Sequence, residues 1–233
     1  MSDISIVGLA HGSRRLEVGD ALDELMSAVG LLSGVPARAA FLDLTEPDLL
    51  QVAVDLANLG VERAVVVPLL FTAAFHATID VPQTVRTAAD ASGIELLVAD
   101  ILGTGDDVVE LLHGTGAAAG ISPTMSVLLY AVGSSREAAN AAVHDLAARL
   151  QAHRAAPVRA AFGTCDPGPE AILDQLPEPR AIVPLFLLPG LLLDPMITMA
   201  AQRGWPIAEP LGIAAAPLIH DRYLRALTTA GLG

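Results

Sequence analysis

The chain has 233 residues, of which 53% are hydrophobic and 17% are charged, and its formal net charge is −13. This composition is typical of a folded protein with a large core and excludes a disordered chain, and the length allows one large domain or two of about 115 residues. The negative charge repels nucleic acid and anionic lipid, so we expect neither as a partner, and an anionic ligand needs local cations or backbone amides to hold it.

The hydrophobic segments are too short for a membrane protein. The longest apolar run, from Ala181 to Leu193, has 13 residues and contains two prolines and a glycine, whereas a membrane-spanning helix needs about 20 apolar residues. The N-terminus carries an acid at Asp3 and lacks the basic stretch of a secretory signal. The single cysteine, Cys165, cannot form an internal disulfide. We therefore expect a cytoplasmic enzyme that does not bind a membrane.

Apolar strands alternate with amphipathic helices along the first half of the chain. Strand patterns occupy residues 4–10, 35–43, 62–71 and 94–100. Helical patterns occupy residues 16–29, 46–60, 80–93 and 105–115. The run at 62–71 is too uniformly apolar for a half-exposed strand, so it belongs in a parallel sheet that is covered on both faces. This order of elements predicts a doubly wound α/β fold.

The same order of elements starts again after residues 117–124, a small and turn-rich segment. The string "IVGLAHGSR" resembles "LLYAVGSSR", "VPARAAFLDLTEP" resembles "APVRAAFGTCDP", and "VVVPLLFTAAFHATID" resembles "AIVPLFLLPGLLLDP". We therefore predict two related doubly wound parallel-sheet domains, residues 1–118 and 124–233, with a cleft between them.

The two copies differ where the first copy carries polar chemistry, at the pairs His11 and Val132, His76 and Leu192, and Asp43 and Thr164. The second copy keeps the framework and lacks just these side chains. The comparison therefore argues against a purely structural role for the two histidines, and we expect the active site in the first domain. The other histidines lie on predicted helices, where we expect solvent-facing or capping roles.

His11, Asp43 and His76 each lie at or just beyond the end of a predicted strand. The carboxyl ends of the strands in an open parallel sheet surround the ligand crevice, so the three side chains can converge there. Two imidazoles and a carboxylate suit a divalent first-row metal with open coordination positions. Imidazoles also accept protons near neutral pH. Glu46 is an alternative to Asp43 as the working carboxylate.

Neighbouring residues allow further roles. Ser13 and Arg14 follow the first strand, where backbone amides at a helix start can receive an anion, and a solvated arginine is the alternative. Asp80 begins a helix, where an N-cap is its ordinary role. The segment after the first strand lacks G-x-G-x-x-G, the G-x-x-x-x-G-K-[ST] pattern and the G-x-S-x-G elbow. A nucleotide site and a serine hydrolase are therefore not predicted.

Taken together, "AHGSR", "FLDLTEP" and "VPLLFTAAFHATIDVP" resemble the sirohydrochlorin chelatases of the class II chelatase superfamily, which insert Co²⁺ or Fe²⁺ into a reduced tetrapyrrole. The second half is similar to the degenerate copy in the long, duplicated form of that family. The family's two active-site histidines match His11 and His76. Its metal-associated glutamate falls on Asp43, which shortens the carboxylate by one methylene.

The resemblance implies that sirohydrochlorin binds in the cleft between the halves and that no ATP or other nucleotide is used. His11 and His76, as neutral imidazoles, would coordinate the incoming ion and accept the pyrrole N–H protons, with Asp43 balancing charge. Ser13 and Arg14 would contact the substrate, whose eight carboxylates require local donors. The expected metal substrate is Fe²⁺ or Co²⁺, with Ni²⁺ as a further candidate.

Two other functions stand beside this one. A non-catalytic metal or tetrapyrrole carrier could use the same scaffold and would bind without turnover. A nucleotide-dependent transferase would need a phosphate loop, which the sequence does not show. The pathway is either sirohaem or cobalamin synthesis, and the assembly is either a monomer or a homodimer.

Overall fold

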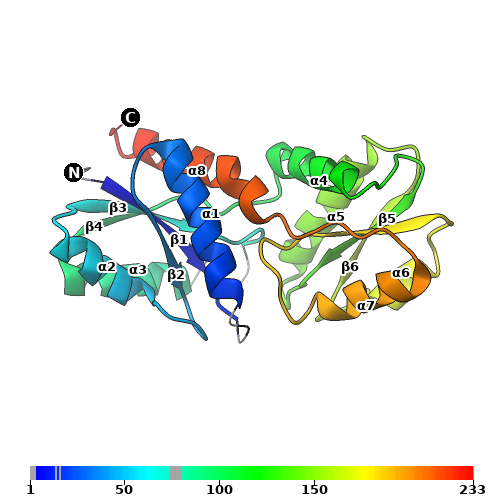
Figure 1. Ribbon diagram of the computed structural model, residues 1–233, viewed down its shortest axis with the longest axis horizontal. Helices are drawn as coiled ribbons and strands as arrows, with labels where there is room; N and C mark the ends of the chain where they lie inside the picture. Colours follow the sequence, from blue (N-terminus) through cyan, green and yellow to red (C-terminus); the bar gives the residue numbers. More distant parts are fainter. Residues whose placement is uncertain (1–3, 14, 16, 74–79, 233) are drawn as a thin grey trace. The chain divides into compact units, whose positions relative to one another are not determined.

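The computed structural model describes residues 4–13, 15, 17–73 and 80–232, and the chain forms two compact units (Figure 1). The first unit consists of Met1–Gly103 and Gly212–Gly233, and the second consists of Thr104–Leu211. Each unit is built around one parallel β-sheet. Within the described residues, no helix combines the length and the apolar character that crossing a membrane requires.

A four-stranded parallel sheet with the order β2-β1-β3-β4 forms the centre of the first unit. Its strands are β1 (Ile4–Ala10), β2 (Ala37–Phe41), β3 (Arg63–Pro68) and β4 (Glu95–Val98). The three consecutive valines of β3, Val65 to Val67, are fully buried. This is the burial that the uniformly apolar run predicts, because both faces of the strand are covered.

Helices cover both faces of this sheet. They are α1 (Glu17–Ser33), α2 (Leu49–Asn58), α3 (Val81–Ser92) and α8 (Ala216–Thr229), the last preceded by the 3₁₀ turn η2 (Gly212–Ala215). Val7 and Leu9 of β1 belong to the apolar cluster that includes α2 and α3. Gly8, between them, faces α1, where a Cβ atom would come within 2.4 Å of the Met26 sulfur. The pair α2 and α3 therefore covers one face, and α1 with α8 covers the other.

The second unit contains a three-stranded parallel sheet with the order β6-β5-β7. Its elements are β5 (Ser126–Ala131), β6 (Val158–Phe162), β7 (Arg180–Pro184), α4 (Asp106–Ala118), α5 (Glu137–Gln151), α6 (Pro169–Leu173) and α7 (Asp194–Arg203). A single parallel bridge between Ile182 and Ile207 stands where the first sheet has its fourth strand. The strand order matches that of β2, β1 and β3, which confirms the predicted pair of related parallel-sheet domains.

The compact units do not follow the predicted linear division into residues 1–118 and 124–233. The chain crosses between the units after Gly103 and again after Leu211, so α4 belongs to the second unit and α8 to the first. α8 buries its apolar face, including Ile219, while it packs against α1 and β3. A helical pattern shows that a segment has an apolar face, but tertiary packing decides which sheet that face covers. The compact units therefore differ from the sequence repeat by one helix at each crossing.

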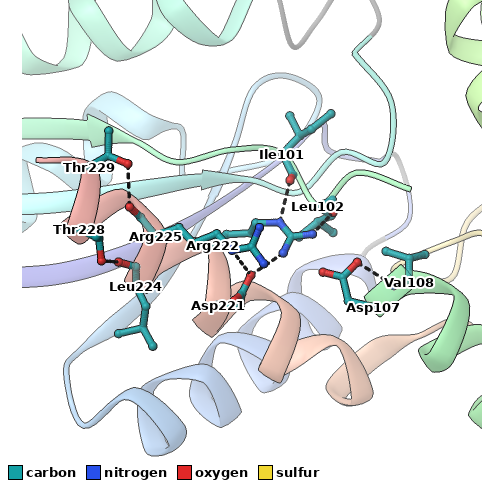
Figure 2. A network of polar contacts seen from close by, with 10 residues as sticks. All are labelled: Ile101, Leu102, Asp107, Val108, Asp221, Arg222, Leu224, Arg225, Thr228 and Thr229. Atoms are coloured by element: carbon teal, nitrogen blue, oxygen red, sulfur yellow. Dashed lines mark hydrogen bonds and ion pairs between the residues drawn. The ribbon is translucent and has the colours of Figure 1, made fainter. Parts of the chain in front are cut away.

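Arg222 holds α8 to the chain just before the first crossing (Figure 2). The side chain is buried, and its Nε atom donates to the carbonyl oxygen of Ile101 at 3.1 Å. One terminal nitrogen donates to the carbonyl oxygen of Leu102, and the other pairs with the Asp221 carboxylate at 2.6 Å. A buried guanidinium destabilises a protein unless its donors find partners, and these partners offset that penalty. These contacts of Arg222 therefore stabilise the packing of α8 in the first unit.

Candidate functional site

His11 and Asp43 lie next to each other at the carboxyl ends of β1 and β2. In the parallel register, Ala10 at the end of β1 is the partner of Phe41 at the end of β2. The hydrogen-bond ladder continues past the strands, because the Leu42 N–H donates to the Ala10 carbonyl at 2.8 Å and the Asp43 N–H donates to the His11 carbonyl at 3.0 Å. The topology thus brings two polar residues from distant parts of the sequence to one edge of the sheet.

Both side chains line a cavity of about 470 Å³ in the first unit. Asp48 contributes to its lining from the start of α2. α3 contributes polar residues at helical spacing, which share one face of the helix: Asp80, Gln83, Thr84 and Thr87. The apolar lining residues come from the end of β2 and the start of α2: Phe41, Leu42, Leu49 and Leu50.

The charge of this cavity is negative. Its described lining holds three carboxylates, those of Asp43, Asp48 and Asp80, beside the imidazole of His11, and no arginine or lysine among the residues that the structure describes. A cleft lined by charges of one sign raises the local concentration of counter-ions. The volume is within the range of small-molecule sites, roughly 300–1,000 Å³. The cavity therefore suits a cation better than an anion.

Local hydrogen bonds orient the carboxylates. The Leu44 N–H donates to Oδ1 of Asp43 at 2.7 Å. Asp48 is the N-cap of α2, where its Oδ1 accepts from the Gln51 N–H at 2.7 Å and Gln51 Oε1 accepts from the Asp48 N–H at 2.8 Å, a capping box. Asp80 occupies the N-cap position of α3, but its side chain makes no capping hydrogen bond, so the ordinary N-cap role expected for it is not seen. Helix capping accounts for Asp48 without a ligand, whereas Asp43 is oriented by the loop that follows its own strand.

Gly12 allows the loop after β1 to approach the loop after β2. Its φ is +101°, and a Cβ atom at this position would lie 1.8 Å from the Asp43 carbonyl oxygen. Side-chain-bearing residues rarely adopt this backbone conformation, and no side chain fits the space. The glycine next to His11 is therefore required by the close contact between the two loops.

Ser13 makes its hydrogen bonds within the loops after β1 and β2. Its N–H donates to Thr45 Oγ1 at 2.9 Å, and its own Oγ accepts from the Arg15 N–H at 3.2 Å. Ser13 is not among the described residues that line the cavity. The predicted contact between Ser13 and substrate therefore stays a prediction.

Two of the predicted site residues, Arg14 and His76, lie outside the described residues. In the part of the chain that the structure describes, no three or more His, Cys, Asp or Glu side chains form a group that could hold a metal. The predicted ligand set of His11, Asp43 and His76 extends beyond that part and stays a prediction. Glu46, the alternative carboxylate, lines a different cavity from the one that His11 and Asp43 share.

The second unit repeats this loop framework without the polar side chains. The Gly163 N–H donates to the Ala131 carbonyl at 3.0 Å, and the Thr164 N–H donates to the Val132 carbonyl at 3.0 Å. Gly133 has a φ of +90° and again lets the two loops approach. Val132 and Thr164 thus occupy the positions that a histidine and an aspartate hold in the first unit, in agreement with the internal comparison of the sequence.

The polar face of α3 is the part of the site that sequence reasoning misses. Its signal is the helical spacing of four polar residues between positions 80 and 87, beside the buried residues Val81, Val85 and Ala88. A polar helix face is usually solvated. Only the position of the loops after β1 and β2 shows that this face lines a cavity.

The fold of the chain is that of solved chelatases. A structure of SirB from Bacillus subtilis with Fe³⁺ matches with a TM-score of 0.82 at 21% identity, over 98% of this chain and 97% of that chain. Sirohydrochlorin chelatase SirB from Bacillus subtilis subspecies spizizenii, in complex with cobalt, matches with a TM-score of 0.76 at 21% identity, over 97% of this chain and 94% of that chain. The protein therefore has the doubly wound α/β fold of this class.

A family model described as CbiX matches residues 5–115 and 126–217, which together make up most of the chain. The chain therefore belongs to the CbiX family. A curated sirohydrochlorin cobaltochelatase from Sulfurisphaera tokodaii is 31% identical over 72 residues, which are 31% of this chain and 58% of that protein. The match thus spans less than two thirds of the length of that relative.

Proposed function

We propose that the protein is a sirohydrochlorin chelatase, which inserts Fe²⁺ or Co²⁺ into sirohydrochlorin without a nucleotide. The observation that carries the proposal is the acid-lined cavity shared by His11 and Asp43, in a chain of the CbiX family. The relative from Sulfurisphaera tokodaii bears the name of a sirohydrochlorin cobaltochelatase, and the two SirB structures hold Fe³⁺ and cobalt. These names support the substrate and the class of metal.

The metal ion enters the site as a substrate. The carboxylates that line the cavity attract a divalent cation, and Asp43 offsets its charge next to His11. In this proposal His11 and His76 coordinate the ion as neutral imidazoles. Imidazole and carboxylate ligands suit Fe²⁺, Co²⁺ and Ni²⁺, and open coordination positions let the ion pass to the nitrogen atoms of the macrocycle.

Insertion exchanges one divalent ion for the protons of two pyrrole N–H groups. The bonds from the ion to His11 and His76 are replaced by bonds to the macrocycle nitrogens, and both N–H bonds break. The released imidazoles then accept these protons and pass them to solvent, because their ordinary pKa lies near neutrality. The sum of charges is unchanged by this exchange, and the proposed step uses no nucleotide.

The negative cavity also constrains how the substrate binds. The peripheral carboxylates of sirohydrochlorin would be repelled by Asp43, Asp48 and Asp80, so we place them outside the cavity. Ser13 and Arg14 are their proposed contacts. Only the central nitrogens then face the metal ion. The second unit, with Val132 in the histidine position, takes no part in coordination.

The test compares His11→Ala and His76→Ala with Val132→Ala, which truncates the position equivalent to His11 in the second unit. Purified protein is incubated anaerobically with sirohydrochlorin and Fe²⁺, Co²⁺ or Ni²⁺, and tetrapyrrole absorbance is followed above the spontaneous background. We expect both histidine variants to lose turnover and Val132→Ala to retain it. A near-normal rate for His76→Ala would reject the assignment.

The same assay separates an enzyme from a carrier. An enzyme forms many molecules of metallated product per molecule of protein, whereas a metal or tetrapyrrole carrier stops at stoichiometric binding. The ion that gives the highest rate over background identifies the product, and the product decides between sirohaem and cobalamin synthesis as its destination.

A further inference from the structure

Thr45 joins the loop that carries His11 to the loop that carries Asp43. Its Oγ1 accepts a hydrogen bond from the Ser13 N–H at 2.9 Å and donates one to the Ser13 carbonyl oxygen at 2.8 Å. Closer to the strands, the Asp43 N–H donates to the His11 carbonyl at 3.0 Å. The two loops are therefore bonded at the pair itself, through the backbone of His11 and Asp43, and again beyond it through Thr45.

The backbone between Asp43 and Thr45 adopts an unusual conformation. Leu44 has a φ of +63° although it is not glycine, and its side chain is 51% exposed, so burial of the leucine does not explain the conformation. Such a residue persists only where its surroundings determine its backbone, and such sites concentrate at functional positions. Here the Thr45 N–H donates to the Asp43 carbonyl at 2.8 Å, and the Leu44 N–H donates to Oδ1 of Asp43 at 2.7 Å. The anchoring of Thr45 thus also orients the carboxylate.

The second unit holds the equivalent serine in a different way. There the side chain of Asn140, from α5, accepts from the Ser134 N–H at 2.9 Å and donates to the Ser134 carbonyl at 2.8 Å. In both units, one side chain therefore accepts from the N–H of this serine and donates to its carbonyl oxygen. Only in the first unit, which has His11 and Asp43, does that side chain come from the loop that carries the carboxylate.

The two loops also differ in length. In the first unit a hydrogen bond from the Phe41 N–H to the Pro47 carbonyl closes the loop, and in the second unit the bond runs from the Phe162 N–H to the Pro167 carbonyl, both at 3.0 Å. The first loop is one residue longer than the second. The link through Thr45 stands in the unit with the longer loop, which also carries His11 and Asp43.

We infer that Thr45 is a positioning residue, which fixes the imidazole of His11 relative to the carboxylate of Asp43. The inference rests on the proposed function, since it assigns a purpose to that fixed geometry. Thr45 is not among the described residues that line the cavity, so it acts through the two loops and not by touching the substrate. The arrangement keeps both groups ready for the ion before it enters.

The test compares Thr45→Val, which keeps the shape of the side chain and removes its hydroxyl, with Thr45→Ser, which keeps the hydroxyl. Thr164→Val is the matched control, because the Thr164 hydroxyl donates to the Val132 carbonyl at 2.8 Å in the equivalent loops of the second unit. Misplacement of reacting groups by about 1 Å lowers rates by on the order of 100-fold. We expect Thr45→Val to lose kcat by about 10-fold to 100-fold with little change in KM for the tetrapyrrole.

Thr45→Ser should restore most of kcat, and Thr164→Val should match the wild-type protein. Thr45→Ala replaces Thr45→Val if the valine variant does not fold. An independent measurement follows the imidazole signals of His11 by NMR without metal or substrate. A narrow set of signals in the wild-type protein and in Thr45→Ser, broadened only in Thr45→Val, supports the positioning role.

Each remaining outcome has one meaning. If the wild-type protein turns over and Thr45→Val behaves like Thr164→Val, the positioning role is wrong and the proposed function stands. If the wild-type protein shows no turnover above background, the proposed function fails, and the NMR signals of His11 alone decide whether Thr45 positions His11. Broadening confined to Thr45→Val then supports the positioning of His11, and unchanged signals overturn it.

Discussion

Replacing Gly12 by alanine tests whether the close approach of the two loops sets the geometry of the site. A residue other than glycine at φ +101° destabilises the fold by about 1–3 kcal/mol. The new Cβ atom would also lie 1.8 Å from the Asp43 carbonyl oxygen, where real Cβ atoms essentially never come closer than 3.0 Å. The loops must therefore separate by about 1.2 Å, which breaks the bond from the Asp43 N–H to the His11 carbonyl and removes about 1 kcal/mol more.

The expected total is a loss of about 2–4 kcal/mol of unfolding free energy, measured by urea denaturation. Because the displacement exceeds 1 Å at His11 and Asp43, the chelatase rate should fall by on the order of 100-fold. Gly133→Ala is the matched control, since its φ is +90° and its Cβ would meet Cys165 Sγ at 2.8 Å and Phe162 Cβ at 2.9 Å. It should lose stability, by less than Gly12→Ala, and keep its rate. If Gly12→Ala stays within about threefold of the rate of Gly133→Ala, the reasoning from loop geometry to activity is refuted.

Three further predictions concern charge and burial. Arg222→Met removes the donors to the buried carbonyl of Leu102 and the partly buried carbonyl of Ile101, and it should destabilise the protein by about 2–3 kcal/mol in urea unfolding. Arg225→Met removes an exposed ion pair within α8 and should change the stability by less than about 1 kcal/mol. Burial raises the pKa of Tyr130, so this tyrosine ionises first in the unfolded state, and the free energy of unfolding should fall as pH rises above the ordinary tyrosine pKa. Tyr130→Phe should lose about 1 kcal/mol of stability at neutral pH and show a shallower decline of stability at alkaline pH. An unchanged alkaline decline in Tyr130→Phe would contradict this direction. Asp43→Asn keeps an oxygen that can accept from the Leu44 N–H but removes the charge, so the chelatase rate should fall at least about 10-fold without a change in stability. Glu46→Gln should leave the chelatase rate unchanged. The reverse result would make Glu46 the working carboxylate.

Much of the architecture could be predicted from local patterns. The apolar runs at 4–10 and 62–71 become β1 and β3, and the helical pattern at 80–93 becomes α3 (Val81–Ser92). The ends of the strands differ more. The run at 94–100 forms the shorter strand Glu95–Val98, although the Ala99 N–H still donates to the Val66 carbonyl of β3 at 2.9 Å.

The candidate site could be predicted only in part. The rule that ligands gather at the carboxyl edge of a parallel sheet places His11 and Asp43 together, and both line one cavity in the structure. The same rule does not indicate Thr45, whose role depends on hydrogen bonds to Ser13 across two loops. It also does not indicate the polar face of α3, because the sequence of a polar helix face does not show whether solvent or a cavity lies opposite it.

The order of elements, the duplication and the difference between the two copies were determined by the sequence alone, because burial periodicity and turn residues are local properties that each segment carries in itself. The position of α4 in the second unit and of α8 in the first, the separation of Glu46 from His11, and the link through Thr45 were decided only by the tertiary structure. The physical reason is that an apolar stripe or a hydroxyl group specifies the kind of partner it needs. Which partner it finds depends on packing and hydrogen-bond geometry that form only when distant segments meet.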